Sequence, residues 1–263
     1  MPNLLDAHFH FGIERSISSL EAGYNPDHAL PAGGIVNGTH PADWPNIVEL
    51  AKRYPQFIPA LGIHPRKVKQ CPHDWREHLQ TIPKASNYMI GEIGLDASPK
   101  FRSSLPRQIE LFSAQWQRAQ SQQQIAIIHC VRALGPLLKV ITSTPAQRPF
   151  LMHAYSGPID LVTQLIDMGA YFSFNVQQLH SSAKRIRAVI SAIPTDRILV
   201  ESDQDVMECI RVGQNSKNAY QATLRGSYQA IAEIRQQRIP SLIALVERNF
   251  AQFTEHPSDK SHS

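Results

Sequence analysis

The sequence predicts an α/β protein, a (β/α)8 barrel of the TIM type. Three observations lead to this prediction. The chain contains eight short runs of β-branched and apolar residues, segments of helical periodicity separate most of these runs, and a length of 263 residues suits a single barrel. Alternating strands and helices are typical of βαβ units built around a parallel sheet.

The eight predicted strands are short and mostly apolar. They cover Asn3–His8, Gly34–Asn37, Phe57–Gly62, Tyr88–Glu92, Ile125–His129, Phe150–His153, Ala170–Phe174 and Ile198–Glu201. The clearest helical patterns between them cover Pro41–Tyr54, Leu105–Gln123, Pro158–Met168 and Ser181–Ala192. Prolines suit the first turn of three of these helices, and Gly169 suits the end of one. The stretch from Gly23 to Gly34 is loop-like, so the helix expected between the first two strands has no clear pattern.

The composition is that of an ordinary globular protein, with 42% hydrophobic and 18% charged residues. We expect one barrel domain at residues 1–254 and a flexible tail at residues 255–263. The net charge of +4 leans toward polyanionic partners but is too mild to identify one. The three cysteines form no Cys-x-x-Cys pair, which argues against a disulfide framework or a thiolate zinc site and favours a reducing compartment. Without a leader-like segment or a long apolar run, we expect a cytoplasmic protein with no membrane contact and no obligate protein partner.

The most informative stretch is Asp6-Ala7-His8-Phe9-His10, at the end of the first apolar run. Side chains alternate along a strand, so Asp6, His8 and His10 are expected on one face, where two imidazoles can bind one metal ion. A chain of this composition contains the D-x-H-x-H spacing by chance only about 0.02 times. The structural alternative is a pair of buried histidines that bond to one another.

Further metal-ligand types stand where other predicted strands end. Glu92 ends the fourth strand, His129 the fifth and His153 the sixth, and Asp203 follows the eighth. Catalytic groups of such barrels gather at the carboxyl ends of the strands. Each of these residues alone could be structural, but together with the first-strand histidines they predict a metal site on one rim.

At this point the chain resembles the TatD-type deoxyribonuclease family, metal-dependent hydrolases of the amidohydrolase-like barrel class. The motifs that carry the resemblance are Asp6-x-His8-x-His10, Gly62-Ile63-His64-Pro65, Gly91-Glu92-Ile93-Gly94-Leu95-Asp96, Ile128-His129, His153-x-Tyr155-Ser156-Gly157 and Glu201-Ser202-Asp203.

The resemblance implies a site for two divalent metal ions. One ion would be held by His8, His10, Glu92 and Asp203, and the other by Glu92, His129 and His153. Glu92 is the best candidate for a carboxylate that bridges the two ions. Asp6 is expected to support the site by orienting a ligand imidazole through its other ring nitrogen. A mixed imidazole and carboxylate set suits zinc, manganese or nickel, and the family is usually assayed with magnesium.

The mechanism that follows as a hypothesis is metal-assisted hydrolysis of a phosphodiester. Asp203 would take a proton from a water activated between the ions, and His64, as in the family, would bind phosphate or transfer a proton. The basic residues that follow the motifs and could meet phosphates are Arg66, Lys67, Lys100, Arg102 and Arg132. Of these, Arg66, Lys100 and Arg132 are selected as candidate phosphate contacts. The expected substrate is single-stranded DNA, cleaved from an end.

Two other functions stay open. The same residues could polarise the carbonyl of a small ester, amide or lactone, and a non-catalytic scaffold could keep the fold. Residues 204–225 show no family pattern, and loops after barrel strands select substrates. The sequence therefore predicts metal chemistry more firmly than it predicts the substrate.

Overall fold

The computed structural model describes residues 4–12, 30–85, 87–179, 183–212 and 219–255. Its eight strands all pair in parallel, which confirms the predicted fold class. The strands are β1 (Leu5–His10), β2 (Gly33–Asn37), β3 (Phe57–Ala60), β4 (Ile90–Asp96), β5 (Ala126–Val131), β6 (Phe150–Met152), β7 (Ala170–Phe174) and β8 (Ile198–Val200).

The strands form two sheets, one in the order β1-β2-β3 and one in the order β4-β5-β6-β7-β8. The two sheets are not joined by continuous strand pairing. Isolated bridges between single residue pairs connect them at two positions, here called seams. At one seam Ala60 forms an isolated bridge with Met89, and at the other His10 forms one with Asp205. With these two bridges, the strands follow one another around the barrel in the order in which they occur in the chain.

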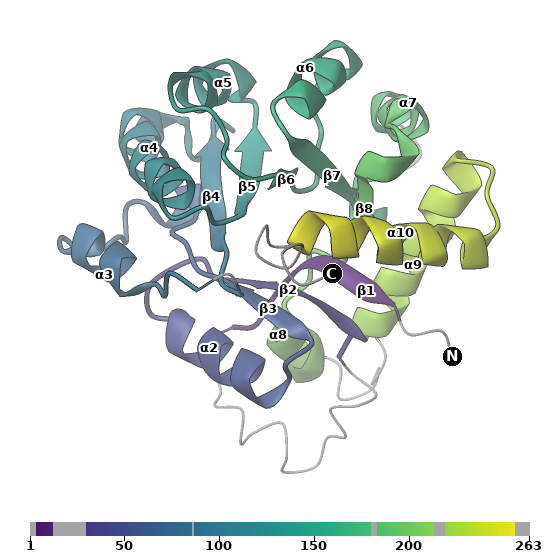
Figure 1. The fold of residues 1–263 in the computed structure, drawn as a ribbon, viewed down its shortest axis with the longest axis horizontal. Coiled ribbons are helices and arrows are strands. Elements are labelled where there is room, and N and C mark those ends of the chain that lie inside the picture. Colours follow the sequence, from purple (N-terminus) through teal and green to yellow (C-terminus); the bar gives the residue numbers. More distant parts are fainter. Residues whose placement is uncertain (1–3, 13–29, 86, 180–182, 213–218, 256–263) are drawn as a thin grey trace, which may run out of the picture.

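Helices surround the strands (Figure 1). They are α2 (Trp44–Arg53), α3 (Trp75–Thr81), α4 (Leu105–Ser121), α5 (Leu134–Ser143), α6 (Val162–Asp167), α7 (Lys184–Ala192), α8 (Val206–Val212), α9 (Ala219–Ile234) and α10 (Ile239–Thr254). Among the helices of the described residues, none is both long and apolar enough to cross a membrane.

Each of the four clearest predicted helices corresponds to an observed one, with shifts at the ends. The stretch predicted at Pro158–Met168 begins as a 3-10 turn, Ile159–Leu161, before α6 starts. Gly169 follows α6 with φ of 98°, a conformation that glycine adopts without strain. The helix expected between the first two strands and the tail beyond residue 255 lie outside the described residues, so the assigned domain limits stay a prediction.

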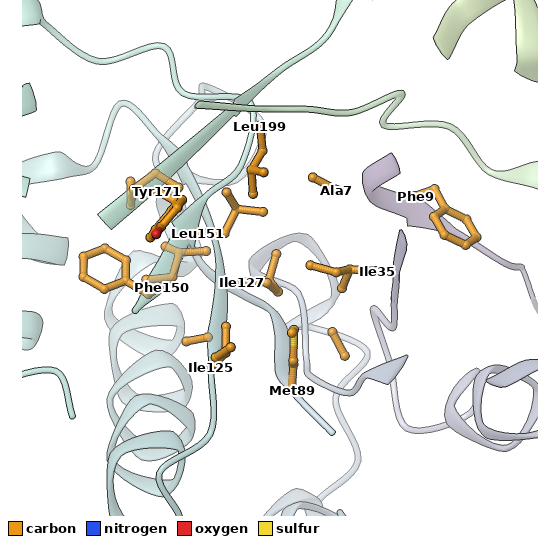
Figure 2. Close-up of a cluster of buried hydrophobic side chains, with 14 of the residues drawn as sticks. Ala7, Phe9, Ile35, Met89, Ile125, Ile127, Phe150, Leu151, Tyr171 and Leu199 are labelled. Carbon is orange, nitrogen blue, oxygen red and sulfur yellow. The ribbon is translucent and has the colours of Figure 1, made fainter. Parts of the chain in front are cut away.

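The core fills the interior of the barrel with apolar side chains from several strands. Figure 2 shows Ile35 of β2, Ile127 of β5, Leu151 of β6 and Leu199 of β8 gathered around its centre. All four are fully buried. Packed layers of branched side chains are characteristic of such barrels, and they leave polar chemistry to the carboxyl ends of the strands.

Candidate metal centre

The six residues predicted as metal ligands meet at the carboxyl ends of the strands. They are His8, His10, Glu92, His129, His153 and Asp203, which come from β1, β4, β5 and the segments after β6 and β8. All but His8, which is fully buried, line a cavity of about 470 Å³. His64, after β3, lines the same cavity.

Glu92 lies at the centre of the cluster and faces two groups of imidazoles with its two oxygens. Its Oε2 is 3.3 Å from His8 Nε2 and 3.4 Å from His10 Nε2. Its Oε1 is 3.0 Å from His64 Nε2, 2.9 Å from His129 Nδ1 and 3.1 Å from His153 Nε2. This division is what a carboxylate needs in order to bridge two cations.

Asp203 completes the side of the site near β1. Its Oδ1 lies 3.8 Å from His8 Nε2 and 3.7 Å from His10 Nε2, and its side chain is one-third exposed to the cavity. The residue has φ of 53°, a left-handed conformation that aspartate tolerates better than most residues. Its backbone N–H donates to the carbonyl oxygen of His8 at 3.0 Å, which ties the segment after β8 to β1.

The donor set fits metal binding. The Oε1 atom of Glu92 is buried and has no partner with hydrogen-bond geometry among the described residues, although three imidazole nitrogens lie around it. Three groups bring their potential ligand atoms within 4.8 Å of one another: His8–His10–Glu92, His8–His153–Glu201 and His64–Glu92–His129. The first of them consists entirely of predicted ligands. Nitrogen and oxygen donors that converge in this way suit zinc, manganese or nickel.

The electrostatics keep the central carboxylate charged. Burial favours the neutral form of Glu92, but the surrounding imidazoles, His64 first among them, hold its pKa well below the ordinary value. Burial lowers the pKa of His64 to about 4, so this imidazole is neutral at physiological pH. Burial opposes the charged form of His10 as well, yet its contacts with Asp203 and Glu92 raise its pKa to about 9 in the metal-free protein.

The tautomer of His64 follows from its neighbours. Its Nδ1 accepts a hydrogen bond from the backbone N–H of Arg66 at 3.0 Å, at the start of the short 3-10 helix η2 (Pro65–Lys67). Because the neutral ring then carries its proton on Nε2, it presents an N–H toward Glu92 and the cavity. His64 is therefore placed as a hydrogen-bond donor.

Partners behind the imidazoles hold three of them in place. His129 Nε2 is 3.4 Å from Asp96 Oδ2, and His153 Nδ1 is 3.3 Å from Glu201 Oε1. His10 Nδ1 is 2.9 Å from the carbonyl oxygen of Asn37. Such partners determine which ring nitrogen carries the proton and which faces the site.

Asp6 differs from the prediction, because it supports the backbone and not an imidazole. Its Oδ1 accepts from the backbone N–H groups of His8 and Ser202, both at 3.0 Å, and its Oδ2 accepts from the Tyr220 hydroxyl at 2.6 Å. The ring of Phe9 also contacts Tyr220, so Asp6 faces the side of β1 where Phe9 lies. The expected alternation fails because the pairing register of β1 shifts between Asp6 and Phe9.

The three basic residues predicted as phosphate contacts divide into two sets. Arg66 lines the cavity, whereas Lys100 and Arg132 are exposed and are absent from its lining. Lys67, which follows the same motif but was not among the three residues selected, also lines the cavity. The guanidinium of Arg66 also forms an ion pair with Asp96, with Nε 2.7 Å from Oδ2.

Gly94, in β4, lies too close to the backbone of β5 for any residue with a side chain. Gly94 has φ of 139°, and a Cβ atom there would lie 2.0 Å from the carbonyl oxygen of His129. The close approach brings the carboxyl end of β4 against β5, with Glu92 and Asp96 on either side of the glycine.

Sequence reasoning did not assign roles to three residues that the structure places behind the site. Glu201 and Asp96 stand inside motifs that carried the resemblance, so their position relative to the ligands was a usable signal. Tyr220, 214 residues from Asp6, had none.

Comparisons with known proteins agree with this geometry. Residues 5–255 match the family model described as TatD related DNase. A protein of Mycoplasma pneumoniae named an uncharacterized metal-dependent hydrolase is 24% identical over 241 residues, which is 88% of this chain and 91% of that protein. The 3'-5' ssDNA/RNA exonuclease TatD of Pectobacterium parmentieri is 27% identical over 178 residues, which is 65% of this chain and 67% of that enzyme.

Among solved structures, the TatD homologue YjjV of Escherichia coli K12 has the same fold. The TM-score is 0.80 at 22% sequence identity, over 97% of this chain and 99% of that chain. The family match extends over nearly the whole described chain, and the candidate ligands lie at the carboxyl ends of the strands. The chain therefore belongs to the TatD related DNase family and is a metal-dependent hydrolase of that family.

Proposed function

We propose that this protein hydrolyses phosphodiester bonds of nucleic acid, with single-stranded DNA cleaved from an end as the expected substrate. The observation that carries the proposal is the position of Glu92, whose two oxygens face two separate groups of imidazoles. The similarity to an enzyme named a 3'-5' ssDNA/RNA exonuclease supports the choice of substrate.

In this proposal two divalent cations, Mg²⁺, Mn²⁺, Zn²⁺ or Ni²⁺, would occupy the centre. His8, His10, Glu92 and Asp203 would hold one of them, and Glu92, His129 and His153 would hold the other. When bound, such cations would lower the pKa of water and stabilise negative charge on the reacting oxygens.

The protein's own side chains supply the proton transfer. Burial disfavours the charged form of Asp203, but its contact with His10 and the charges of nearby imidazoles hold its pKa below the ordinary value. The ionised carboxylate borders the cavity and accepts a proton from the attacking water. The oxygen of that water bonds to phosphorus, the bond from phosphorus to the leaving oxygen breaks, and the leaving oxygen takes up a proton from solvent.

His64 and the two basic residues of η2 position the phosphate. All three residues line the cavity, where the Nε2–H of His64 donates to a phosphate oxygen and Arg66 and Lys67 supply positive charge. Cations beside the ligands favour a phosphodiester over a neutral ester or lactone, which would gain nothing from them.

Incubation of the metal-loaded protein with end-labelled DNA tests the proposal. Single-stranded DNA, duplex DNA, RNA and a panel of small esters are compared, with Mg²⁺, Mn²⁺, Zn²⁺ and Ni²⁺ added separately after chelator treatment. We expect release of nucleotides from single strands, and Glu92→Ala should abolish it in a folded protein. Glu110→Gln, at an exposed ion pair with Arg76, is the matched control and should keep full activity. Ester hydrolysis without any nucleotide release would contradict the nuclease and favour the small-substrate alternative.

A further inference from the structure

Asp96, the last residue of β4, touches two parts of the site at once. Its Oδ2 accepts from Arg66 Nε at 2.7 Å and lies 3.4 Å from His129 Nε2. The side chain is fully buried, whereas that of Arg66 is about half exposed. One carboxylate oxygen therefore lies between a candidate metal ligand and a cation of the cavity wall.

The surroundings of Asp96 hold it rigidly. Its Oδ1 accepts from the backbone N–H of Ser98 at 2.8 Å. The side-chain amide of Gln108, on α4, accepts from the backbone N–H of Asp96 at 2.7 Å and donates to its carbonyl oxygen at 3.0 Å. Hydrogen bonds to both the side chain and the backbone leave this carboxylate little freedom to move.

Each partner of Asp96 turns its other side toward the cavity. The second nitrogen of His129, Nδ1, faces Glu92 Oε1 at 2.9 Å, so a proton held on Nε2 by Asp96 leaves the Nδ1 lone pair for a metal. The guanidinium of Arg66 lies 5.5 Å from the centroid of the Phe101 ring and lines the cavity. Asp96 and Phe101 thus both contact the guanidinium.

We propose that Asp96 is a positioning residue that couples the metal centre to substrate recognition, because it orients His129 for the metal and Arg66 for a substrate phosphate. The proposal rests on the proposed function for the identity of the anion. It predicts that Arg66 binds phosphate well only while Asp96 holds its Nε, and that metal affinity depends on Asp96 but not on Arg66.

The test uses binding measurements on the full chain, so it does not depend on turnover. Asp96→Asn, Arg66→Gln and the double variant are compared for their affinity for Mn²⁺, and for the affinity of the Mn²⁺-loaded proteins for inorganic phosphate. An ion pair at the surface before β8 provides matched controls, with 2.8 Å between Asp196 Oδ2 and Arg197 Nη1. Asp196→Asn and Arg197→Gln should leave both affinities unchanged.

We expect Asp96→Asn to weaken Mn²⁺ binding about 10- to 100-fold, the usual effect of removing a partner behind a ligand imidazole. Arg66→Gln should leave Mn²⁺ binding within about twofold but weaken phosphate binding roughly tenfold. In the double variant phosphate should bind no more than about twofold weaker than in Asp96→Asn, because Arg66 has already lost its orientation. Full additivity of the two phosphate effects, or unchanged Mn²⁺ affinity in Asp96→Asn, would overturn the coupling.

Two further measurements keep the proposal testable if Asp96→Asn does not fold. In the metal-free wild-type protein, ¹⁵N NMR of the histidine rings should show His129 protonated at Nε2, and the opposite tautomer would overturn the role of Asp96. Arg66→Lys keeps the charge but removes the Nε–H, and it should weaken phosphate binding about as much as Arg66→Gln. Wild-type phosphate affinity in Arg66→Lys would show that orientation by Asp96 is unnecessary. Absence of nuclease activity in the wild-type protein would count against the proposed function and leave these outcomes intact.

Discussion

Two replacements of Glu201 distinguish its effect on metal binding, through His153, from its effect on the stability of the barrel. The side chain is fully buried, and its Oε1 accepts from Asn175 Nδ2 at 2.9 Å and faces His153 Nδ1 at 3.3 Å. Its Oε2 accepts from the Ser173 hydroxyl. Glu201→Ala leaves the Asn175 amide and the His153 N–H buried without this acceptor, at a cost of about 1–3 kcal/mol each. We expect the free energy of unfolding of the metal-free protein to fall by about 2–6 kcal/mol.

Glu201→Gln keeps the volume and one acceptor oxygen, and the Ser173 hydroxyl can accept from the new amide. Its loss of stability should therefore be smaller, below about 2 kcal/mol, while its metal affinity should fall about 10- to 100-fold because His153 loses a charged partner. Urea unfolding of the metal-free proteins measures the first effect, and competition with a chromophoric chelator measures the second. Glu110→Gln, at the protein surface, is the control for both. Wild-type metal affinity in Glu201→Gln would refute the supporting role.

Three further predictions concern protonation, the rim and the backbone. Metal affinity should rise with pH from pH 7 to 9, because two ligand imidazoles must lose their protons before they can bind: His10, with a pKa of about 9, and His153, where, despite burial, contacts with Glu92 and Glu201 hold the pKa well above the ordinary value. Titrations that give one affinity at pH 7, 8 and 9 would contradict this. Lys67→Gln should raise KM for a phosphodiester several-fold, because Lys67 lines the cavity. Lys100→Gln is the control, since Lys100 lies outside the cavity lining, and should leave KM unchanged. Equal changes of KM in steady-state kinetics would count against Lys67 as a phosphate contact. Gly94→Ala should lower the free energy of unfolding by more than about 2 kcal/mol, because a Cβ atom there meets the His129 carbonyl oxygen. Gly135→Ala, in α5, has open space around its new Cβ and should not lower it. Urea unfolding compares the two proteins, and a Gly94→Ala protein as stable as the wild type would refute the close approach of β4 to the His129 carbonyl.

The strands and the convergence of the ligands were predictable from the sequence for one physical reason. Parallel strands of a barrel end on the same rim, so residues far apart in the chain, such as His8 and His153, meet once each strand is located. The structure brings the six candidate ligands together, with Glu92 at their centre. Their roles as ligands remain a proposal that metal titration decides.

Features that depend on local irregularity or on distant helices were not predictable. Strict alternation placed Asp6 with the histidines, but the register shift in β1 turns it toward Tyr220 on α9. The positions of the basic residues around the cavity depend on loop geometry, which motif spacing does not determine. The selection therefore kept Lys100, which does not line the cavity, and left out Lys67, which does.

Electron paramagnetic resonance of the protein saturated with Mn²⁺ tests the central claim most directly, because a carboxylate bridge couples the spins of two ions about 3.5–4 Å apart. We predict two bound ions per chain with a spin-coupled spectrum, and loss of the coupling in Glu92→Gln. A single ion per chain, or two ions whose spectrum is uncoupled in the wild-type protein, would contradict the assignment of Glu92 as the bridge between two metal ions.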